Sequence, residues 1–233
     1  MGTTSSDVKV LSAGAIEPGL IAAAEAFGKE SGSHVAIEWA TTPTIRQLVA
    51  SGSVADILVV PPDAVDHFAA AGKIADGQSV YLGRVGVGIA VRDGAPEPAI
   101  DSAETLKQAL LDAESVVFNR ASSGLYVEQL LGRMGVADAI QAKAVRYSNG
   151  PEMLQHLIDG KGREFGFCAI IEILMYCNKG LRLVGPLPES IQRYTTYMAV
   201  PMTVGANLRG AREFLLYLGS PDARRIFASY GIE

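Results

Sequence analysis

Short apolar stretches alternate with amphipathic stretches along nearly the whole chain. Apolar runs of about four to eight residues rich in β-branched side chains predict strands, whereas apolar residues at helical spacing predict helices. The run Ala55–Val60, interrupted only by Asp56, is typical of a buried parallel strand. We expect strands at Val8–Leu11, Val35–Trp39, Ala55–Val60, Val80–Val91, Ser115–Phe118, Ala144–Tyr147, Phe165–Ala169, Leu181–Val184 and Arg193–Val200.

The stretches between these strands have helical patterns and recognisable helix starts. The segment Asp101-Ser102-Ala103-Glu104 has the pattern of a capping box. Pro151 and Pro221 suit the first turn of a helix, where a missing N–H costs nothing. We expect helices at Ile21–Lys29, Ile45–Ala50, Asp63–Ala71, Asp101–Leu111, Ser123–Met134, Pro151–Asp159, Ile171–Cys177 and Ala206–Leu218, and a last helix from Pro221.

Regular alternation of strands and helices predicts an α/β fold of mainly parallel sheets flanked by helices. Two strands, Val80–Val91 and Arg193–Val200, are long enough to pass between two lobes, and the first contains three glycines that permit bends. We therefore predict a two-lobed protein with two hinge crossings. Lobe one is residues 1–85 plus 195–233, and lobe two is residues 86–194.

Composition narrows the possible partners. The chain is 48% hydrophobic with a net charge of −5, and no basic cluster suggests nucleic acid as a partner. No apolar run approaches the roughly 20 residues of a membrane span. The polar start Met1–Asp7 does not resemble a signal peptide. The protein is therefore expected to be periplasmic if a leader has been removed from this sequence, and cytoplasmic otherwise.

Neither cysteines nor histidines indicate a metal or cofactor site. Cys168 and Cys177 flank a predicted strand-to-helix junction, and we expect two buried free thiols rather than a disulfide. The histidines at 34, 67 and 156 share no ligand spacing, so no metal site is predicted. No phosphate-binding loop, dinucleotide fingerprint or nucleophile elbow occurs, and we expect no cofactor.

Candidate ligand residues lie where predicted strands end and helices begin, which is where open α/β sheets bind ligands. Such junctions offer backbone N–H groups and the positive end of a helix dipole, which suit a small anion. The alternative is that their hydroxyl and amide side chains only cap helices. The candidates are Ser12, Ala13 and Gly14 at the first junction; Thr41, Thr42 and Thr44 at the second; Asn119, Arg120, Ser122 and Ser123 at the third; and Asn149 at the fourth.

Charged residues beside these junctions have two interpretations each. Arg120 could clamp a carboxylate with its planar fork of donors, or pair on the surface with Glu128 or Asp138. Arg46 is expected to form a structural salt bridge. A general base, if the protein is an enzyme, would be Glu17 or Glu172. Both are more simply explained as acids favoured in the first turn of a helix.

In this order, the junctions resemble those of the molybdate-binding proteins of ABC transporters, which have the type II periplasmic-binding-protein fold. The resemblance covers nearly the whole chain. It is carried by the second-junction segment 42–48, by Ala55-Asp56-Ile57-Leu58, by Gly166-Phe167-Cys168-Ala169 and by the terminal segment 220–231. The ligand positions depart from the family: Gly14 replaces a serine, Ala169 a tyrosine, and Asn119-Arg120 a Gly-Asp pair. These departures favour a larger or carboxylated anion.

The sequence shows no large apolar surface stripe and hinge closure needs no partner subunit, so we expect a monomer. The resemblance implies a substrate-binding protein that closes around a small anion, either a tetrahedral oxyanion or a small organic acid. It would present this ligand to the permease of an ABC-type transporter. The alternative is a cytoplasmic isomerase or tautomerase of a small organic acid on the same fold, with Arg120 as the anion clamp and Glu17 or Glu172 as the acid–base group.

Overall fold

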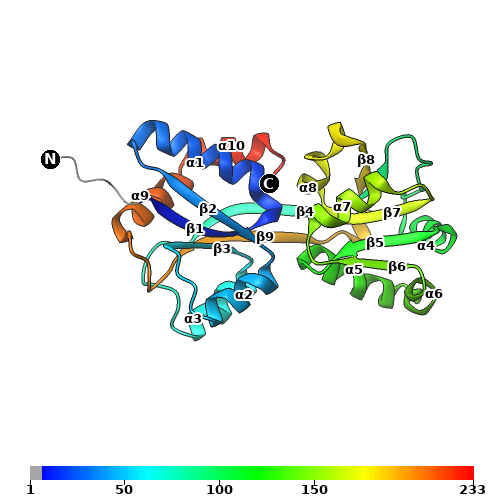
Figure 1. Cartoon of the computed structure of the whole chain (residues 1–233), viewed down its shortest axis with the longest axis horizontal. Coiled ribbons are helices and arrows are strands. Elements are labelled where there is room, and N and C mark those ends of the chain that lie inside the picture. Colours follow the sequence, from blue (N-terminus) through cyan, green and yellow to red (C-terminus); the bar gives the residue numbers. More distant parts are fainter. Residues whose placement is uncertain (1–6) are drawn as a thin grey trace. The chain divides into compact units, whose positions relative to one another are not determined.

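The computed structural model describes residues 7–233, and the remainder of the polar start, residues 1–6, lies outside this range. The chain forms two compact units (Figure 1). Unit 1 comprises the residues up to Arg84 together with Thr196–Glu233, and unit 2 comprises Val85–Thr195. The chain leaves unit 1 within β4 (Val80–Arg92) and returns within β9 (Tyr194–Pro201), the two long strands expected from the sequence.

The sheet of unit 1 has the strand order β2-β1-β3-β9. Strand β1 pairs in parallel with β2 and β3, whereas β9 runs antiparallel to β3. The carboxyl ends of the three parallel strands therefore meet at one edge. The elements are β1 (Val8–Ala13), β2 (Val35–Ala40), β3 (Ile57–Val60), α1 (Glu17–Ser31), α2 (Thr42–Ala50), α3 (Pro62–Ala70), α9 (Leu208–Leu218) and α10 (Pro221–Ser229).

Unit 1 is held together by packing of its terminal helices and by one buried acid. Helices α1 and α10 lie side by side in Figure 1. Helix α1 also contacts α9, where the ring centroids of Phe27 on α1 and Phe214 on α9 are 5.0 Å apart. Asp56 is only 1% exposed, and its carboxylate accepts the backbone N–H groups of Lys9, at 2.8 Å, and Asn207, at 2.7 Å. This acid therefore joins the first strand to the start of α9.

The sheet of unit 2 has the order β4-β7-β5-β6, with β8 on the other side of β4. Strand β5 pairs in parallel with β6 and β7, and β4 runs antiparallel to β7 and β8. The elements after β4 are α4 (Ala103–Asp112), β5 (Ser115–Asn119), α5 (Ser122–Arg133), α6 (Ala137–Gln141), β6 (Ala144–Tyr147), α7 (Gly150–Asp159), β7 (Glu164–Ala169), α8 (Ile170–Leu174) and β8 (Leu181–Pro186).

Alternate residues of these strands build two separate apolar layers. Val116 and Phe118 point to the layer that contains α4, α5 and α6, whereas Val117 points to the layer that contains α7 and α8. Cys168 belongs to the second layer and is fully buried. Figure 1 shows α7 and α8 on one face of this sheet and α5 and α6 on the other.

Several local predictions need correction. The capping box is formed by Ser102 and Thr105, so the helix begins at Ala103. Helix α6 was not expected. Asp56 precedes β3 rather than forming part of it, because its carboxylate holds other backbone groups. Helix α8 ends at Leu174, and the chain continues into a short 3-10 turn that leaves Cys177 exposed rather than buried.

None of the helices within residues 7–233 is long and apolar enough to cross a membrane. Over the same residues, no three His, Cys, Asp or Glu side chains gather as the ligands of one metal ion would.

Candidate anion-binding site

The first and second junctions lie at neighbouring strand ends in unit 1, where Ala13 of β1 is in register with Ala40 of β2. Ser12 is fully buried, and its hydroxyl donates to the carbonyl of Ala13 at 3.1 Å. That hydroxyl hydrogen is therefore used within the chain. Residues Gly14–Ile16 form a 3-10 turn that leads directly into α1, so backbone N–H groups are the main donors that this junction offers.

The second junction caps helix α2 and also offers a hydroxyl hydrogen to a ligand. The Thr41 hydroxyl accepts the backbone N–H of Thr44 at 3.3 Å and lies 2.8 Å from the Thr44 hydroxyl. Two hydroxyls that share one hydrogen bond leave one hydrogen free for a ligand. Thr42 is buried at the start of α2. The capping interpretation and the binding interpretation are therefore compatible here.

Arg46 has the structural role expected for it. Its Nη2 lies 2.8 Å from Oδ2 of Asp63, and its guanidinium lies over the Phe68 ring, 6.0 Å from the centroid. Glu17 occupies the first turn of α1, where a negative side chain complements the helix dipole.

The third junction, in unit 2, contains the inward-facing amide of Asn119 and the exposed guanidinium of Arg120. Asn119 is 1% exposed; its Oδ1 accepts the N–H of Ala121 at 2.9 Å, and its Nδ2 donates to Sγ of Cys168 at 3.4 Å. Asn119 therefore shapes the loop from within. Arg120 is exposed, and within residues 7–233 its guanidinium makes no hydrogen bond or ion pair.

Within residues 7–233, Arg120 is paired with neither of the two surface acids considered for it. Glu128 accepts from Arg146 at 2.8 Å, and no ion pair joins Asp138 to Arg120 in the part of the chain described. Helix α5 begins beside Arg120 with Ala121 at its N-cap, so no side chain satisfies the first N–H groups of the helix. Ser122 and Ser123 are the first two residues of the helix, with Ser123 largely buried. This junction thus combines a free guanidinium with an uncapped helix start.

The fourth junction lies next to the third, because Asn119 of β5 is in register with Tyr147 of β6. Asn149 caps α7 by accepting the N–H of Glu152 at 2.9 Å. The carboxylate of Glu172 lies against the first residue of this helix: a Cβ on Gly150 would come within 2.8 Å of Oε2. The chain therefore brings its own carboxylate to the start of α7.

Sequence reasoning did not foresee the contact that holds this carboxylate. The thiol of Cys168 donates to Oε2 of Glu172 at 2.8 Å. Burial raises the pKa of this thiol well above its usual value, and the neighbouring Glu172 carboxylate raises it further. The thiol is therefore a neutral donor at ordinary pH. The available signal was the spacing, since Cys168 precedes Glu172 by four residues across the end of a strand.

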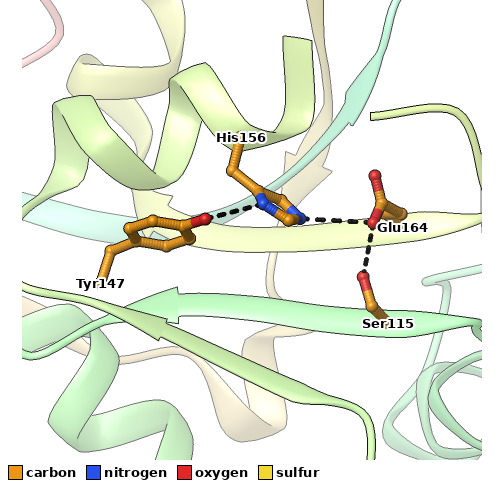
Figure 2. A network of polar contacts seen from close by, with 4 residues as sticks. All are labelled: Ser115, Tyr147, His156 and Glu164. Carbon is orange, nitrogen blue, oxygen red and sulfur yellow. Dashed lines mark hydrogen bonds and ion pairs between the residues drawn. The ribbon is translucent and has the colours of Figure 1, made fainter. Parts of the chain in front are cut away.

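Figure 2 shows a second polar network in unit 2. The Tyr147 hydroxyl lies 2.8 Å from Nδ1 of His156, whose Nε2 lies 3.3 Å from Oε1 of Glu164. Ser115 donates to the same carboxylate oxygen at 2.9 Å. Because Ser115 and Glu164 begin β5 and β7 while Tyr147 ends β6, the network braces α7 against both ends of the sheet.

A family model described as bacterial extracellular solute-binding protein matches residues 8–233. The match covers all but the first seven residues of the sequence. This chain belongs to that family. The resemblance to molybdate-binding proteins and the type II periplasmic-binding-protein fold predicted from the sequence are thereby confirmed.

Solved structures of solute-binding proteins share this fold. The periplasmic molybdate-binding protein of Azotobacter vinelandii is 17% identical, with a TM-score of 0.80 over 97% of this chain and 99% of that one. A sulfate-binding protein of Mycobacterium tuberculosis is 18% identical, with a TM-score of 0.78 over 97% of this chain and 86% of that one. At these identities, the likeness shows the fold alone.

A curated relative of this solute-binding protein carries the name of an enzyme. An aconitate isomerase from a Pseudomonas species is 29% identical over 230 residues, which is 96% of this chain and 86% of that protein. Both functions considered from the sequence, solute binding and isomerisation of a small acid, therefore occur among proteins similar to this one.

Proposed function

We propose that this solute-binding protein binds a small organic anion with more than one carboxylate, using the strand-end junctions described above. The observation that carries the proposal is the exposed Arg120 guanidinium, which has no partner within residues 7–233 and lies beside the uncapped start of α5. A guanidinium binds a carboxylate through two parallel hydrogen bonds, and free N–H groups at a helix start add donors for a second anionic group.

Tetrahedral oxyanions are the competing ligand class. In such sites, neutral hydroxyl and backbone donors surround the whole anion, and an added arginine is not required. The donors of unit 1 suit either class, because backbone N–H groups and threonine hydroxyls carry no shape-specific charge. Arg120 is what favours a carboxylated ligand, and the similarity to an aconitate isomerase supports the same chemistry.

The family suggests the setting in which this binding is useful. Extracellular solute-binding proteins of this type act outside the cytoplasmic membrane, and we propose that the present protein works there as a monomer. Its partner would be the permease of an ABC-type transporter, to which it would deliver the bound anion.

A second candidate function is isomerisation of the bound acid. The specific observation that favours it is the similarity to an aconitate isomerase over almost the whole chain. Aconitate is an unsaturated tricarboxylate, so it also belongs to the ligand class that Arg120 favours. Isomerisation requires one acid–base group close to the ligand, and Glu172 lies at the same sheet edge as Arg120.

Binding is tested by thermal unfolding with two ligand panels. One panel contains molybdate, tungstate, sulfate and phosphate, and the other contains citrate, cis-aconitate, trans-aconitate and tricarballylate. A ligand present at about 100 times its Kd stabilises the folded state by about 2.7 kcal/mol, which raises the Tm by several degrees. We expect the shift with the tricarboxylates. A shift with the oxyanion panel alone would overturn the carboxylate proposal.

The role of Arg120 is tested by titration calorimetry on Arg120→Ala. Losing a charged, two-pronged contact should weaken tricarboxylate binding by about 10- to 100-fold, equivalent to about 1.4–2.7 kcal/mol. Lys161→Ala is the matched control, because Lys161 is also an exposed cation of unit 2 without an ion pair in the described chain. Equal affinities of the two variants would refute the assignment of Arg120.

A further inference from the structure

Unit 2 contains a short chain of hydrogen bonds that ends at the sheet edge. Asn119 Nδ2 donates to Sγ of Cys168 at 3.4 Å, and the Cys168 thiol donates to Oε2 of Glu172 at 2.8 Å. The three residues come from the end of β5, the end of β7 and α8. All donors point the same way, so the acceptor at the end of the chain is the Glu172 carboxylate.

The surroundings make this an unusual use of a thiol. Cys168 is fully buried, and both its burial and the adjacent carboxylate favour the neutral S–H form. A neutral thiol cannot serve as a nucleophile or a metal ligand. It can act as a fixed donor to the carboxylate. Cys177, by contrast, is exposed and only donates to the Ile173 carbonyl at 3.5 Å.

Space for the carboxylate is provided by a glycine. Any side chain at position 150 would place its Cβ 2.8–2.9 Å from the carboxylate atoms of Glu172. The carboxylate is thus held between the thiol and the backbone start of α7, while the residue as a whole is only partly buried. Glu172 is therefore held at the same sheet edge as Arg120, and part of its side chain is exposed.

We propose that Glu172 is the acid–base residue of an isomerase activity and that Cys168 is a positioning residue that fixes its carboxylate. The proposal rests on the second candidate function above. It names an unsaturated tricarboxylate such as aconitate as the substrate, and it assigns the proton transfer to unit 2.

The proton balance needs no other reactant. The ionised Glu172 removes a proton from the saturated carbon that lies between a carboxylate and the double bond. The C–H electron pair becomes a new double bond, and the electron pair of the original double bond takes up a proton at its far carbon. Glu172, now a carboxylic acid, returns its proton there and ends ionised. One C–H bond breaks and another forms, without a change in oxidation state.

The first experiment compares isomerisation of cis-aconitate by the wild-type protein and Glu172→Gln. Loss of a positioned acid–base group should lower kcat by about 10²- to 10⁴-fold. Tricarballylate, which has no double bond, should bind both proteins with affinities within about threefold if the amide leaves the site intact. Glu189→Gln is the control, since Glu189 is an exposed acid of unit 2 without a side-chain contact in the described residues.

The second experiment separates positioning from mere packing at Cys168. Cys168→Ala removes the donor, whereas Cys168→Ser keeps an O–H that can donate to Glu172. Loss of a donor favours the protonated carboxyl, so the acid limb of the kcat/KM profile should move to higher pH in Cys168→Ala and stay near its original position in Cys168→Ser. Tyr147 on β6, Glu152, His156 and Asp159 on α7, and Tyr176 after α8 are titratable groups on the neighbouring elements, and they are unchanged in both variants.

The outcomes are distinguishable. An active wild-type protein whose Glu172→Gln variant keeps full turnover overturns this inference and leaves the isomerase function standing. A further outcome is that the wild-type protein binds tricarballylate, yet neither isomerises cis-aconitate nor catalyses exchange of the hydrogens of cis-aconitate with deuterated solvent. That result would refute both the isomerase function and this inference. Equal pH profiles for Cys168→Ala and Cys168→Ser would overturn the positioning role. Cys177→Ser should change none of these measurements.

Discussion

The two units of this protein use the same architecture at their strand ends but equip it differently. In unit 1, the only cation at the second junction, Arg46, is committed to Asp63, and the remaining side chains are neutral. In unit 2, Arg120 is uncommitted and Glu172 is fixed by a buried thiol. The second junction of unit 1 therefore offers neutral donors that suit any small anion, whereas the two residues that we propose discriminate between ligands and move a proton, Arg120 and Glu172, lie in unit 2.

Each unit also contains a carboxylate that accepts hydrogen bonds, Asp56 in unit 1 and Glu172 in unit 2, and the two differ in burial. Asp56 accepts two backbone N–H groups, and because it is almost completely buried its carboxylate is not accessible to a ligand. Glu172 is partly exposed, and its carboxylate accepts a hydrogen bond from the Cys168 thiol. The first arrangement stabilises a fold, and the second keeps a carboxylate oriented at an accessible edge.

The largest expected effect comes from removing the buried acid of unit 1. Asp56→Ala leaves the part-buried N–H groups of Lys9 and Asn207 without the carboxylate oxygens to which they donate, which should lower the free energy of unfolding by roughly 3–5 kcal/mol. Urea unfolding measures the loss, and hydrogen exchange should localise it to unit 1. Asp56→Asn, which keeps one acceptor oxygen, should lose about half as much. A loss below about 1 kcal/mol for Asp56→Ala would contradict this account.

A smaller effect is expected from the third junction of unit 2. A Cβ at Gly124 would overlap the carbonyl oxygen of Asn119, so Gly124→Ala must move the start of α5 away from β5. We expect destabilisation of about 2–3 kcal/mol, and weaker tricarboxylate binding because Arg120 moves with the loop. Urea unfolding and calorimetry report the two effects.

Gly132 in the same helix provides the control. Within residues 7–233, no atom outside the neighbouring residues and the backbone of the helix itself lies within 4 Å of a Cβ placed there. Gly132→Ala should therefore raise stability by about 0.5–1 kcal/mol, because alanine is the better helix former. If both alanine variants changed stability equally, close packing at Gly124 would not be what fixes the junction.

The sequence was sufficient for the fold because the fold follows from periodicity. Apolar strands such as Ala55–Val60 and the long strands near residues 85 and 195 are visible without tertiary information. The positions of the junctions follow as well, since parallel strands end at a common edge. The short helix α6 was missed because five residues contain too few turns for a helical period to emerge.

What each junction residue does could not be predicted, because it depends on side-chain orientation. Ser122 and Ser123 were candidate caps or ligands, yet Ala121 occupies the N-cap position and leaves the start of α5 open. Asn119 was a candidate ligand, but its amide is turned inward to Ala121 and Cys168. The contact between Cys168 and Glu172 depends on a strand end and a helix start meeting at the right angle, which residue spacing alone does not specify.

The smallest expected effect concerns the network in Figure 2, which braces unit 2 in the way that Asp56 braces unit 1. Ser115→Ala removes one donor from Glu164 but leaves its contact with His156 at 3.3 Å, so the carboxylate keeps a partner. The free energy of unfolding should fall by only about 1 kcal/mol, with tricarboxylate affinity unchanged.

The control for this variant is Ser190→Ala, since Ser190 is exposed in unit 2 and should give no measurable loss. Urea unfolding of both variants measures how much of the free energy of unfolding depends on the Ser115 hydrogen bond. A loss of about 4 kcal/mol for Ser115→Ala would mean that the network, like Asp56, cannot be satisfied once one member is gone. Unit 2 would then depend on one partly buried acid, Glu164, as much as unit 1 depends on Asp56, and the difference between the units would be confined to Arg120 and Glu172.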